Sequence, residues 1–258
     1  MKILLKLFQL LYCMYAYVVF IACMLLIFPF AVVASFWGKI QGGNFIYKLC
    51  HLWTDTWLLL IGIRHRNIFE SPLEKGKQYI FIANHISYLD IPIIFKAIRN
   101  RDIRVLGKAE MKKIPIFGFI YSRGAVLVDR SDAEKRAKSV RNLKSILRKG
   151  ISIFIYPEGT FNETHQPLKD FYDGAFRIAI ETKTPIRPIL FLDTYDRMHY
   201  KTIFSLNPGP CRAVFLDEVD VEAFSMKEVA LLKNKVYEQM EKKLLEYRAS
   251  WIEVKERG

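Results

Sequence analysis

The chain has 258 residues, a length that accommodates one α/β domain and a short additional segment. Its formal net charge is +13, and 52% of its residues are hydrophobic, which is above the norm for soluble proteins. The four cysteines form no Cys-x-x-Cys pair, so the sequence predicts neither a metal site nor a disulfide framework and is compatible with a reducing compartment.

An apolar segment dominates the N-terminus. No charged residue occurs between positions 7 and 38, and this run of 32 residues is longer than the ~20 residues that span the hydrocarbon core of a bilayer. It is also longer than the apolar part of a signal peptide, and it ends in Phe36-Trp37 instead of the small residues of a cleavage site. We therefore expect the segment to be retained as a membrane anchor.

A second, amphipathic stretch from Asn44 to Ile63 suits the membrane interface better than a span, because it carries charged residues among tryptophans and leucines. Basic residues stand on both sides of the apolar run, which leaves two arrangements open: a single span, or a two-helix motif that enters and leaves the cytoplasmic leaflet. In both arrangements, residues 1–63 anchor a globular domain, residues 64–258, on the cytoplasmic face of the cell inner membrane or cytoplasmic membrane.

The globular domain is basic, with 35 Lys and Arg residues against 25 Asp and Glu residues. Its net charge of +10 attracts anionic lipid headgroups, which makes the phospholipid bilayer the expected partner. Nucleic acid is not expected as a partner, because the sequence has an apolar anchor and no recognised nucleic-acid-binding module.

Apolar strand-like segments alternate with helical segments through the globular domain. The expected strands are 78–83, 103–106, 125–128, 151–156, 186–192 and 211–216. The expected helices are 91–99, 133–149, 175–182 and 227–247. This alternation predicts an α/β fold, with a mixed, mostly parallel sheet flanked by helices on both faces.

The most informative residues are Asn84, His85 and Asp90, where an apolar strand passes into a turn and then a helix. Pro92 is tolerated only in the first helical turn, so the helix starts near Asp90, His85 lies in the loop before it, and the two side chains can meet. An imidazole can take a proton from a hydroxyl group, and a carboxylate on its other nitrogen fixes the tautomer. The pair is predicted to be a general base and its partner; the structural alternative is a helix cap and a turn residue.

Two further groups follow predicted strands: Asp129-Arg130, and Glu158 with the two residues after it. Strand ends in such sheets converge on a cleft, so these groups should meet His85 there. The planar guanidinium of Arg130 matches phosphate oxygens, although a salt bridge to Asp129 or Glu158 would also explain it. Lys108, after another strand, is a second candidate cation.

The remaining candidates are backbone-shaping residues. Gly159 permits a tight turn and a close approach of backbone N–H groups to an anion, and Thr160 follows it. Asn84 is interpreted either as a residue that positions the substrate or as a turn former.

Four blocks, taken in order, carry a resemblance: Asn84-His85-x4-Asp90, Gly124-x4-Asp129-Arg130, Tyr156-Pro-Glu-Gly-Thr160 and Pro185-Ile-Arg-Pro188. They resemble the motif blocks of the 1-acylglycerol-3-phosphate (lysophosphatidic acid) acyltransferase family, within the glycerolipid acyltransferase superfamily, over about residues 75–195. Phe161 departs from that pattern, because it stands where many members carry an arginine. Tyr172-Asp173 likewise replaces a common pair of lysines.

The resemblance implies a membrane-bound enzyme that moves a fatty acyl group from an acyl carrier protein or acyl-coenzyme A thioester to the 2-hydroxyl group of lysophosphatidic acid, giving phosphatidic acid. It implies no metal and no bound cofactor, catalysis by His85 and Asp90, and substrate binding by a second set of residues. That set is Asn84, Lys108, Arg130, Glu158, Gly159 and Thr160.

Three alternatives stay open on the sequence. A related acyltransferase could act on glycerol 3-phosphate or an aminolipid, since the chain lacks an arginine at position 161. A non-catalytic lipid-binding or scaffold protein could share the fold, although it would not need the His85–Asp90 pair. A lipid hydrolase is disfavoured, because the sequence has no Gly-x-Ser-x-Gly nucleophile elbow.

Overall fold

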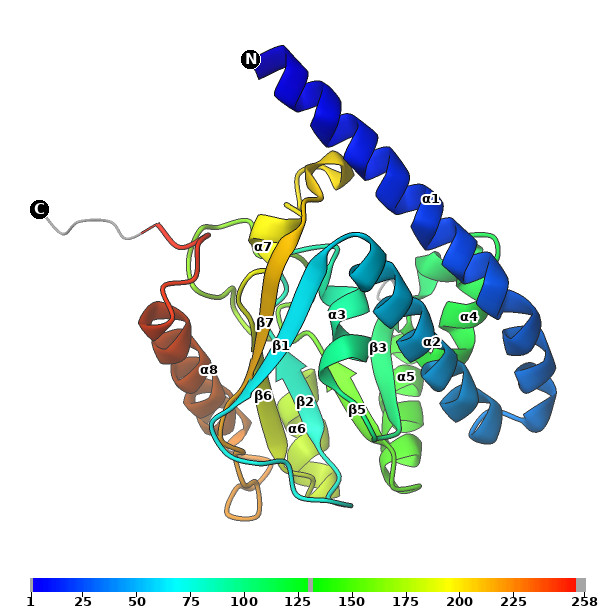
Figure 1. The fold of residues 1–258 in the computed structure, drawn as a ribbon. Helices are drawn as coiled ribbons and strands as arrows, with labels where there is room; N and C mark the ends of the chain where they lie inside the picture. The colour runs from blue at the N-terminus through cyan, green and yellow to red at the C-terminus, as the bar shows by residue number, and fades with distance from the viewer. Residues whose placement is uncertain (1, 130–131, 254–258) are drawn as a thin grey trace, which may run out of the picture.

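The computed structural model describes residues 2–129 and 132–253. Within them, the strands form one sheet in the order β1-β7-β6-β2-β5-β3-β4 (Figure 1). The strands are β1 (Ile63–Phe69), β2 (Ile80–Ala83), β3 (Ile103–Lys108), β4 (Ala125–Val128), β5 (Ser152–Ile155), β6 (Ile186–Phe191) and β7 (Gly209–Phe215). All neighbouring strands are parallel except β6 and β7, so the predicted mixed, mostly parallel sheet is confirmed.

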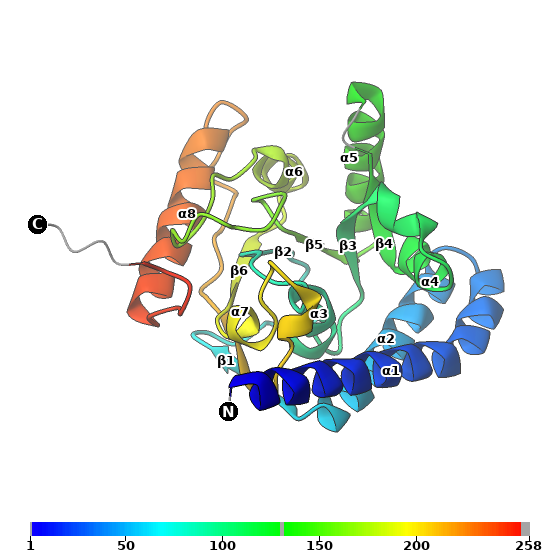
Figure 2. The same cartoon turned by 90° about the horizontal axis from the view of Figure 1, so that it is seen from above.

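Helices cover both faces of this sheet. The α-helices are α1 (Lys2–Ala34), α2 (Gln41–Leu60), α3 (Asp90–Ala97), α4 (Phe117–Gly124), α5 (Ala133–Leu147), α6 (Gly174–Thr182), α7 (Thr194–Arg197) and α8 (Val229–Glu246). The described part of the chain also forms the short 3-10 helices η1 (Ser35–Trp37), η2 (Ala109–Lys113) and η3 (Ile203–Ser205). Seen from above, α1 to α4 lie on one side of the sheet, and α5, α6 and α8 lie on the other (Figure 2).

The alternation of side chains along the strands divides the interior into two cores. In β2, Phe81 and Ala83 point to the core under α1 to α4, whereas Ile80 and Ile82 point to the core under α5, α6 and α8. All four residues are fully buried, which explains why β2 reads as a continuous apolar run. The loops at the carboxyl end of this central strand are thereby held at a fixed position between two packed layers.

Among the strands and α-helices of the described residues, β1, α4 and the four-residue α7 were not predicted from the sequence. β1 carries Arg64, His65 and Arg66 and is partly exposed at the edge of the sheet, so it lacks the apolar run that identified the other strands. α4 has only eight residues, too few for a helical pattern to stand out. All of the strands and helices that the sequence predicted are present, with shifts of a few residues at their ends.

The first two helices pack against the globular part and against each other. Trp57 Nε1 donates a hydrogen bond to the carbonyl oxygen of Ala16 (2.9 Å), and Trp53 Nε1 donates to that of Phe20 (3.1 Å). Small or apolar side chains of α1 are buried in the same core as the sheet: Cys13, Ala16, Cys23, Ile27, Ala31 and Ala34. The predicted boundary at residue 63 therefore marks the start of β1, and the helices before it share a core with the sheet.

We expect Gly42→Ala to destabilise the junction of α1 and α2. A Cβ atom at position 42 would lie 2.1 Å from the carbonyl oxygen of Ala34, and a backbone atom cannot move aside as a flexible side chain can. Overpacking of this kind costs about 1–3 kcal/mol. Thermal unfolding in detergent would measure it, with Gly174→Ala as the control, because a Cβ atom there meets nothing within 4 Å. Equal melting temperatures for the two variants would contradict the expected crowding.

Candidate active site

His85 and Asp90 meet at the carboxyl end of β2. The Nδ1 atom of His85 lies 2.8 Å from Oδ2 of Asp90, which is the first residue of α3. The same oxygen accepts hydrogen bonds from the backbone N–H groups of Ile86 (2.7 Å) and Ser87 (2.9 Å). The predicted contact across the loop-to-helix junction is therefore confirmed, and Asp90 binds the preceding turn instead of serving as a simple helix cap.

This geometry decides which nitrogen of His85 can act as a base. When the Nδ1–H group donates to a carboxylate, the neutral ring carries its lone pair on Nε2. Asp90 is completely buried, whereas the His85 side chain retains 13% exposure. A buried acceptor thus orients a ring whose other nitrogen can face a substrate.

Aromatic rings enclose the imidazole on two sides. The ring of Tyr156 is stacked on His85 with a centroid distance of 4.0 Å and an interplanar angle of 16°. The ring of Phe161 meets His85 edge-on at 4.4 Å and also contacts Tyr88 at 4.8 Å. These contacts restrict rotation of the imidazole and place apolar surface beside it. Phe161, at the position where the family often has an arginine, is therefore part of the wall around His85.

Glu158 is joined to the same turn through the backbone. One carboxyl oxygen accepts from the N–H group of His85 (2.8 Å), and the other accepts from the N–H group of Lys169 (2.9 Å). The residue is 1% exposed. Both oxygens are thus engaged inside the protein, which favours positioning of His85 over direct contact with a substrate.

Asn84 also has a structural contact. Its side chain accepts a hydrogen bond from the N–H group of Phe191 (2.8 Å) and donates to the carbonyl oxygen of the same residue (3.1 Å). Because Asn84 is buried, this double contact continues the pairing of β2 and β6 beyond the last residue of β2. The Asn84 side chain thereby fixes the position at which the His85 loop begins.

Gly159 and Thr160 form the turn that follows β5. Gly159 has a φ of 75°, the left-handed conformation that favours glycine, and its N–H group donates to the carbonyl oxygen of Tyr156 (3.1 Å). The exposed Thr160 accepts a hydrogen bond through Oγ1 from the ammonium group of Lys169 (2.8 Å). Lys169 therefore brings a positive charge to a turn for which the sequence suggested other cations.

The other predicted cations lie along β3 and β4. Lys108 is exposed at the end of β3 and is in register with Val128, the last residue of β4. Asp129 follows directly and accepts a hydrogen bond from Lys135 (2.9 Å). Arg130, the preferred phosphate ligand on the sequence, lies outside the described residues. The ends of β2, β3, β4 and β5 nevertheless share one edge of the parallel sheet, as predicted.

Comparison with known proteins supports the resemblance in the sequence. Residues 65–192 match a family model described as Acyltransferase. The 1-acyl-sn-glycerol-3-phosphate acyltransferase of Haemophilus influenzae is 26% identical over 196 residues, 75% of this chain and 80% of that protein. The Saccharomyces cerevisiae protein of that name is 29% identical over 186 residues, 70% of this chain and 60% of that protein. The chain belongs to the acyltransferase family that this model describes.

The fold of this acyltransferase also has a counterpart among solved structures. The crystal structure of the 1-acyl-sn-glycerophosphate acyltransferase from Thermotoga maritima aligns with a TM-score of 0.74 at 21% identity. The alignment covers 98% of this chain and 100% of that chain, so it includes the two N-terminal helices as well as the sheet.

Sequence reasoning missed the roles of Tyr156, Phe161 and Lys169 in this acyltransferase. Tyr156 and Phe161 belong to or directly follow the block that contains Glu158, and that position was the available signal for a place beside His85. Lys169 gave no such signal, because a lysine in a long loop looks like an ordinary surface residue. Its contacts with Thr160 and Glu158 arise only from the path of the loop.

Glu158 makes a pH-dependent contribution to stability. Burial raises the pKa of its carboxyl group from 4.5 to about 8, and the two backbone donors oppose this shift only in part. Between these pH values the folded state keeps a proton that the unfolded chain releases. The free energy of unfolding should therefore fall as the pH rises through this window.

We expect Glu158→Gln to reduce this pH dependence, since an amide does not titrate. The wild-type unfolding constant should change with pH more steeply than that of the variant, by up to about tenfold per pH unit. Urea unfolding in detergent at several pH values between about 4.5 and 8 would measure the difference. Parallel pH profiles for the two proteins would show that Glu158 does not keep its proton.

Proposed function

We propose that this protein transfers a fatty acyl group from an acyl carrier protein or acyl-coenzyme A thioester to the 2-hydroxyl group of lysophosphatidic acid, forming phosphatidic acid. The observation that carries the proposal is the 2.8 Å contact between His85 Nδ1 and the buried Asp90 carboxylate. The names of its relatives in Haemophilus influenzae and Saccharomyces cerevisiae support the choice of acceptor.

The proposed reaction needs no nucleophile from the protein. The Nε2 atom of His85 takes the proton of the acceptor hydroxyl group as its oxygen attacks the thioester carbonyl carbon. Asp90 stabilises the imidazolium ion that forms. When the tetrahedral intermediate collapses, the carbon–sulfur bond breaks and the imidazolium ion returns the proton to the departing thiolate. The products are an ester and a free thiol, and His85 is neutral again.

The surroundings of His85 favour a lipid acceptor. The Phe161 and Tyr88 rings present apolar surface beside the base, which suits the acyl chain of lysophosphatidic acid better than the fully polar glycerol 3-phosphate. A phosphate group requires cations; Lys169 supplies one beside the turn after β5, and Lys108 supplies another at the end of the neighbouring strand β3. Arg130 remains a further candidate from the sequence.

Residues 1–63 are proposed to attach this domain to the membrane. One helix, Ile3–Trp37, is long and apolar enough to cross a bilayer by length and composition. Its inner side, however, is buried against the domain from Cys13 to Ala34, and its outer side exposes many large apolar side chains. Because the helix packs against the domain along this length, the structure supports its insertion into one leaflet rather than a single crossing of the bilayer. We propose the cytoplasmic leaflet, where both thioester donors would have access.

The central prediction of this mechanism concerns the catalytic pair. His85→Ala should lower turnover by about 10²–10⁴-fold, because the general base is lost. Asp90→Asn should also be severe, since an amide neither fixes the required tautomer nor stabilises the imidazolium ion. The double variant should be scarcely worse than His85→Ala, as expected for residues that act as a unit. Product formation from lysophosphatidic acid, measured by mass spectrometry, gives the rates.

His65→Ala is a control for the loss of a histidine from the sheet edge, and it should retain turnover. Circular dichroism would establish that each variant is folded. Substantial turnover by a folded His85→Ala protein would refute the mechanism and favour a lipid-binding role for the fold.

Lys169→Ala should raise the KM for lysophosphatidic acid more than the KM for the thioester. Loss of one charge-assisted hydrogen bond costs about 1.5–3 kcal/mol. Binding of lysophosphatidic acid should therefore weaken roughly 10- to 100-fold. The substitution keeps the backbone N–H group that holds Glu158. Lys242→Ala, on the exposed side of α8, is the matched control. An equal rise in both Michaelis constants would mean that Lys169 shapes the loop and does not bind phosphate.

A further inference from the structure

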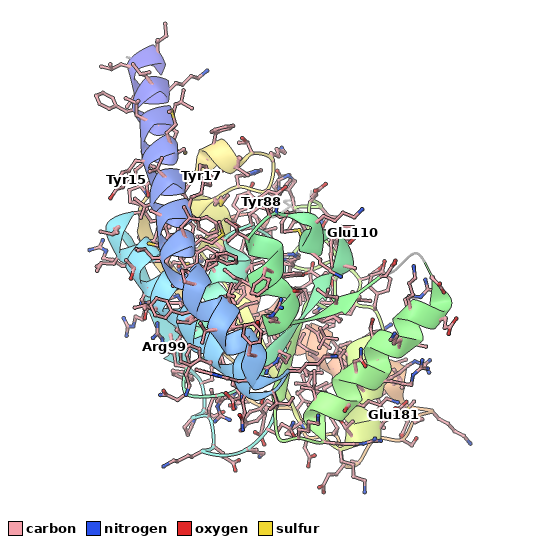
Figure 3. All side chains as sticks on the ribbon, turned by 90° about the vertical axis from the view of Figure 1, so that its right-hand side faces the viewer. Tyr15, Tyr17, Tyr88, Arg99, Glu110 and Glu181 are labelled. Carbon is pink, nitrogen blue, oxygen red and sulfur yellow. The ribbon has the colours of Figure 1, made fainter. Side chains whose placement is uncertain are left out.

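A segment of the globular domain lies against the apolar helix α1. The 3-10 helix η3 is separated from α1 by about 190 positions in the sequence, yet three of the carbonyl groups at residues 203–206 accept hydrogen bonds from α1 side chains. Tyr17 Oη donates to the carbonyl oxygen of Ile203 (2.5 Å), and Cys13 Sγ donates to that of Phe204 (3.2 Å). Figure 3 shows Tyr17 on the part of α1 beside this segment.

The donors on α1 form a regular stripe. Gln9, Cys13 and Tyr17 are spaced four residues apart and lie on one side of the helix, and Gln9 Nε2 donates to the carbonyl oxygen of Leu206 (2.5 Å). Elsewhere between positions 7 and 38, α1 is almost entirely apolar. Irregular backbone is tolerated at membrane depth only when its polar groups are satisfied within the protein. These contacts satisfy that condition for the carbonyl groups of Ile203, Phe204 and Leu206.

Two large side chains of the same segment face outward, whereas Leu206 is buried in the core. Ile203 is 43% exposed and Phe204 is 51% exposed, although both are large and apolar. Residues 202–206 carry no charge, and Lys201, which is exposed, immediately precedes them. This surface continues the exposed apolar side chains of α1, which include Phe8, Leu11, Met14, Val18, Leu25 and Leu26.

We propose that residues 203–206 are a second membrane-inserted segment, which enters the lipid bilayer beside α1. The inference rests on the proposed attachment of α1 to one leaflet. Ile203 and Phe204 contact the lipid acyl chains, α1 satisfies the carbonyl groups behind them, and Lys201 reaches the headgroup region as basic residues at a membrane surface do. The attachment surface is thereby built from two segments that are about 190 positions apart in the sequence.

This second segment connects the membrane to the loop of His85. The N–H group of His199 donates to Ser205 Oγ (2.7 Å), and the carbonyl oxygen of the preceding residue, Met198, accepts from Ser87 Oγ (2.5 Å). Ser87 is two residues after His85, and its N–H group is held by Asp90. The depth at which η3 inserts therefore sets the height of the base above the bilayer from which lysophosphatidic acid comes.

Site-specific fluorescence tests the proposal without requiring turnover. Phe204→Cys would be labelled with the polarity-sensitive dye NBD and reconstituted in phosphatidylcholine–phosphatidylglycerol vesicles. The matched control is Leu231→Cys, an exposed apolar position on α8. The four native cysteines are buried, so the unsubstituted protein serves as the labelling blank. Dye at position 204 should emit at shorter wavelength and be quenched by nitroxide-labelled lipid chains, with several-fold weaker quenching by aqueous iodide than dye at position 231.

Two results would overturn the proposal. Equal iodide quenching at the two positions would place residue 204 in water. Protection of position 204 from both iodide and the nitroxide lipids would mean that protein, such as a second copy of the chain, covers the segment. Flotation of the labelled protein with the vesicles reports attachment by α1 separately, and formation of phosphatidic acid reports the proposed reaction separately.

A charge substitution provides a second measurement. Phe204→Asp should reduce partitioning into the same vesicles by about tenfold, because a carboxylate is costly in the apolar region of a bilayer. Leu231→Asp should leave partitioning unchanged. Equal partitioning of the two folded variants would contradict insertion of residue 204.

Discussion

The buried carboxylate of Asp90 is the interaction on which the candidate site depends. Oδ2 accepts from the His85 ring and from the N–H groups of Ile86 and Ser87, so one atom fixes both the turn and the base. Asp90 also begins α3, where the partial positive charge of the helix end favours a carboxylate. Because the side chain is completely buried, the positive ends of these donors replace water around Oδ2.

Side-chain hydrogen bonds connect the carboxyl ends of neighbouring strands around this turn. Asn84 links the end of β2 to β6, and Glu158 links the loop after β5 to the backbone of His85. The parallel sheet brings these loops to one edge, and the hydrogen bonds between them remove much of their freedom. The base is therefore positioned before a substrate arrives, which reduces the reorganisation that a reaction would require.

Apolar contacts complete the arrangement at two scales. Near the base, Tyr156 and Phe161 pack on the imidazole. On the molecular surface, α1 and η3 expose large apolar side chains, while polar side chains of α1 bind the carbonyl groups of η3. In the proposed function, the membrane-inserted surface holds the site close to its lipid acceptor. The aromatic side chains beside His85 then contact the acyl chain of that acceptor.

The sequence by itself determined the mostly parallel sheet, the apolar N-terminal helix and the meeting of His85 with Asp90. Each depends on a local pattern: apolar runs at strand length, a long uncharged run, and a proline that fixes the start of a helix. β1 escaped prediction because it lacks an apolar run and is defined by its pairing with β7, a partner about 145 positions away. Only the tertiary structure decided that Glu158 holds the backbone of His85, that Lys169 reaches Thr160 and that η3 lies on α1, because these contacts join segments whose proximity is set by packing of the whole chain.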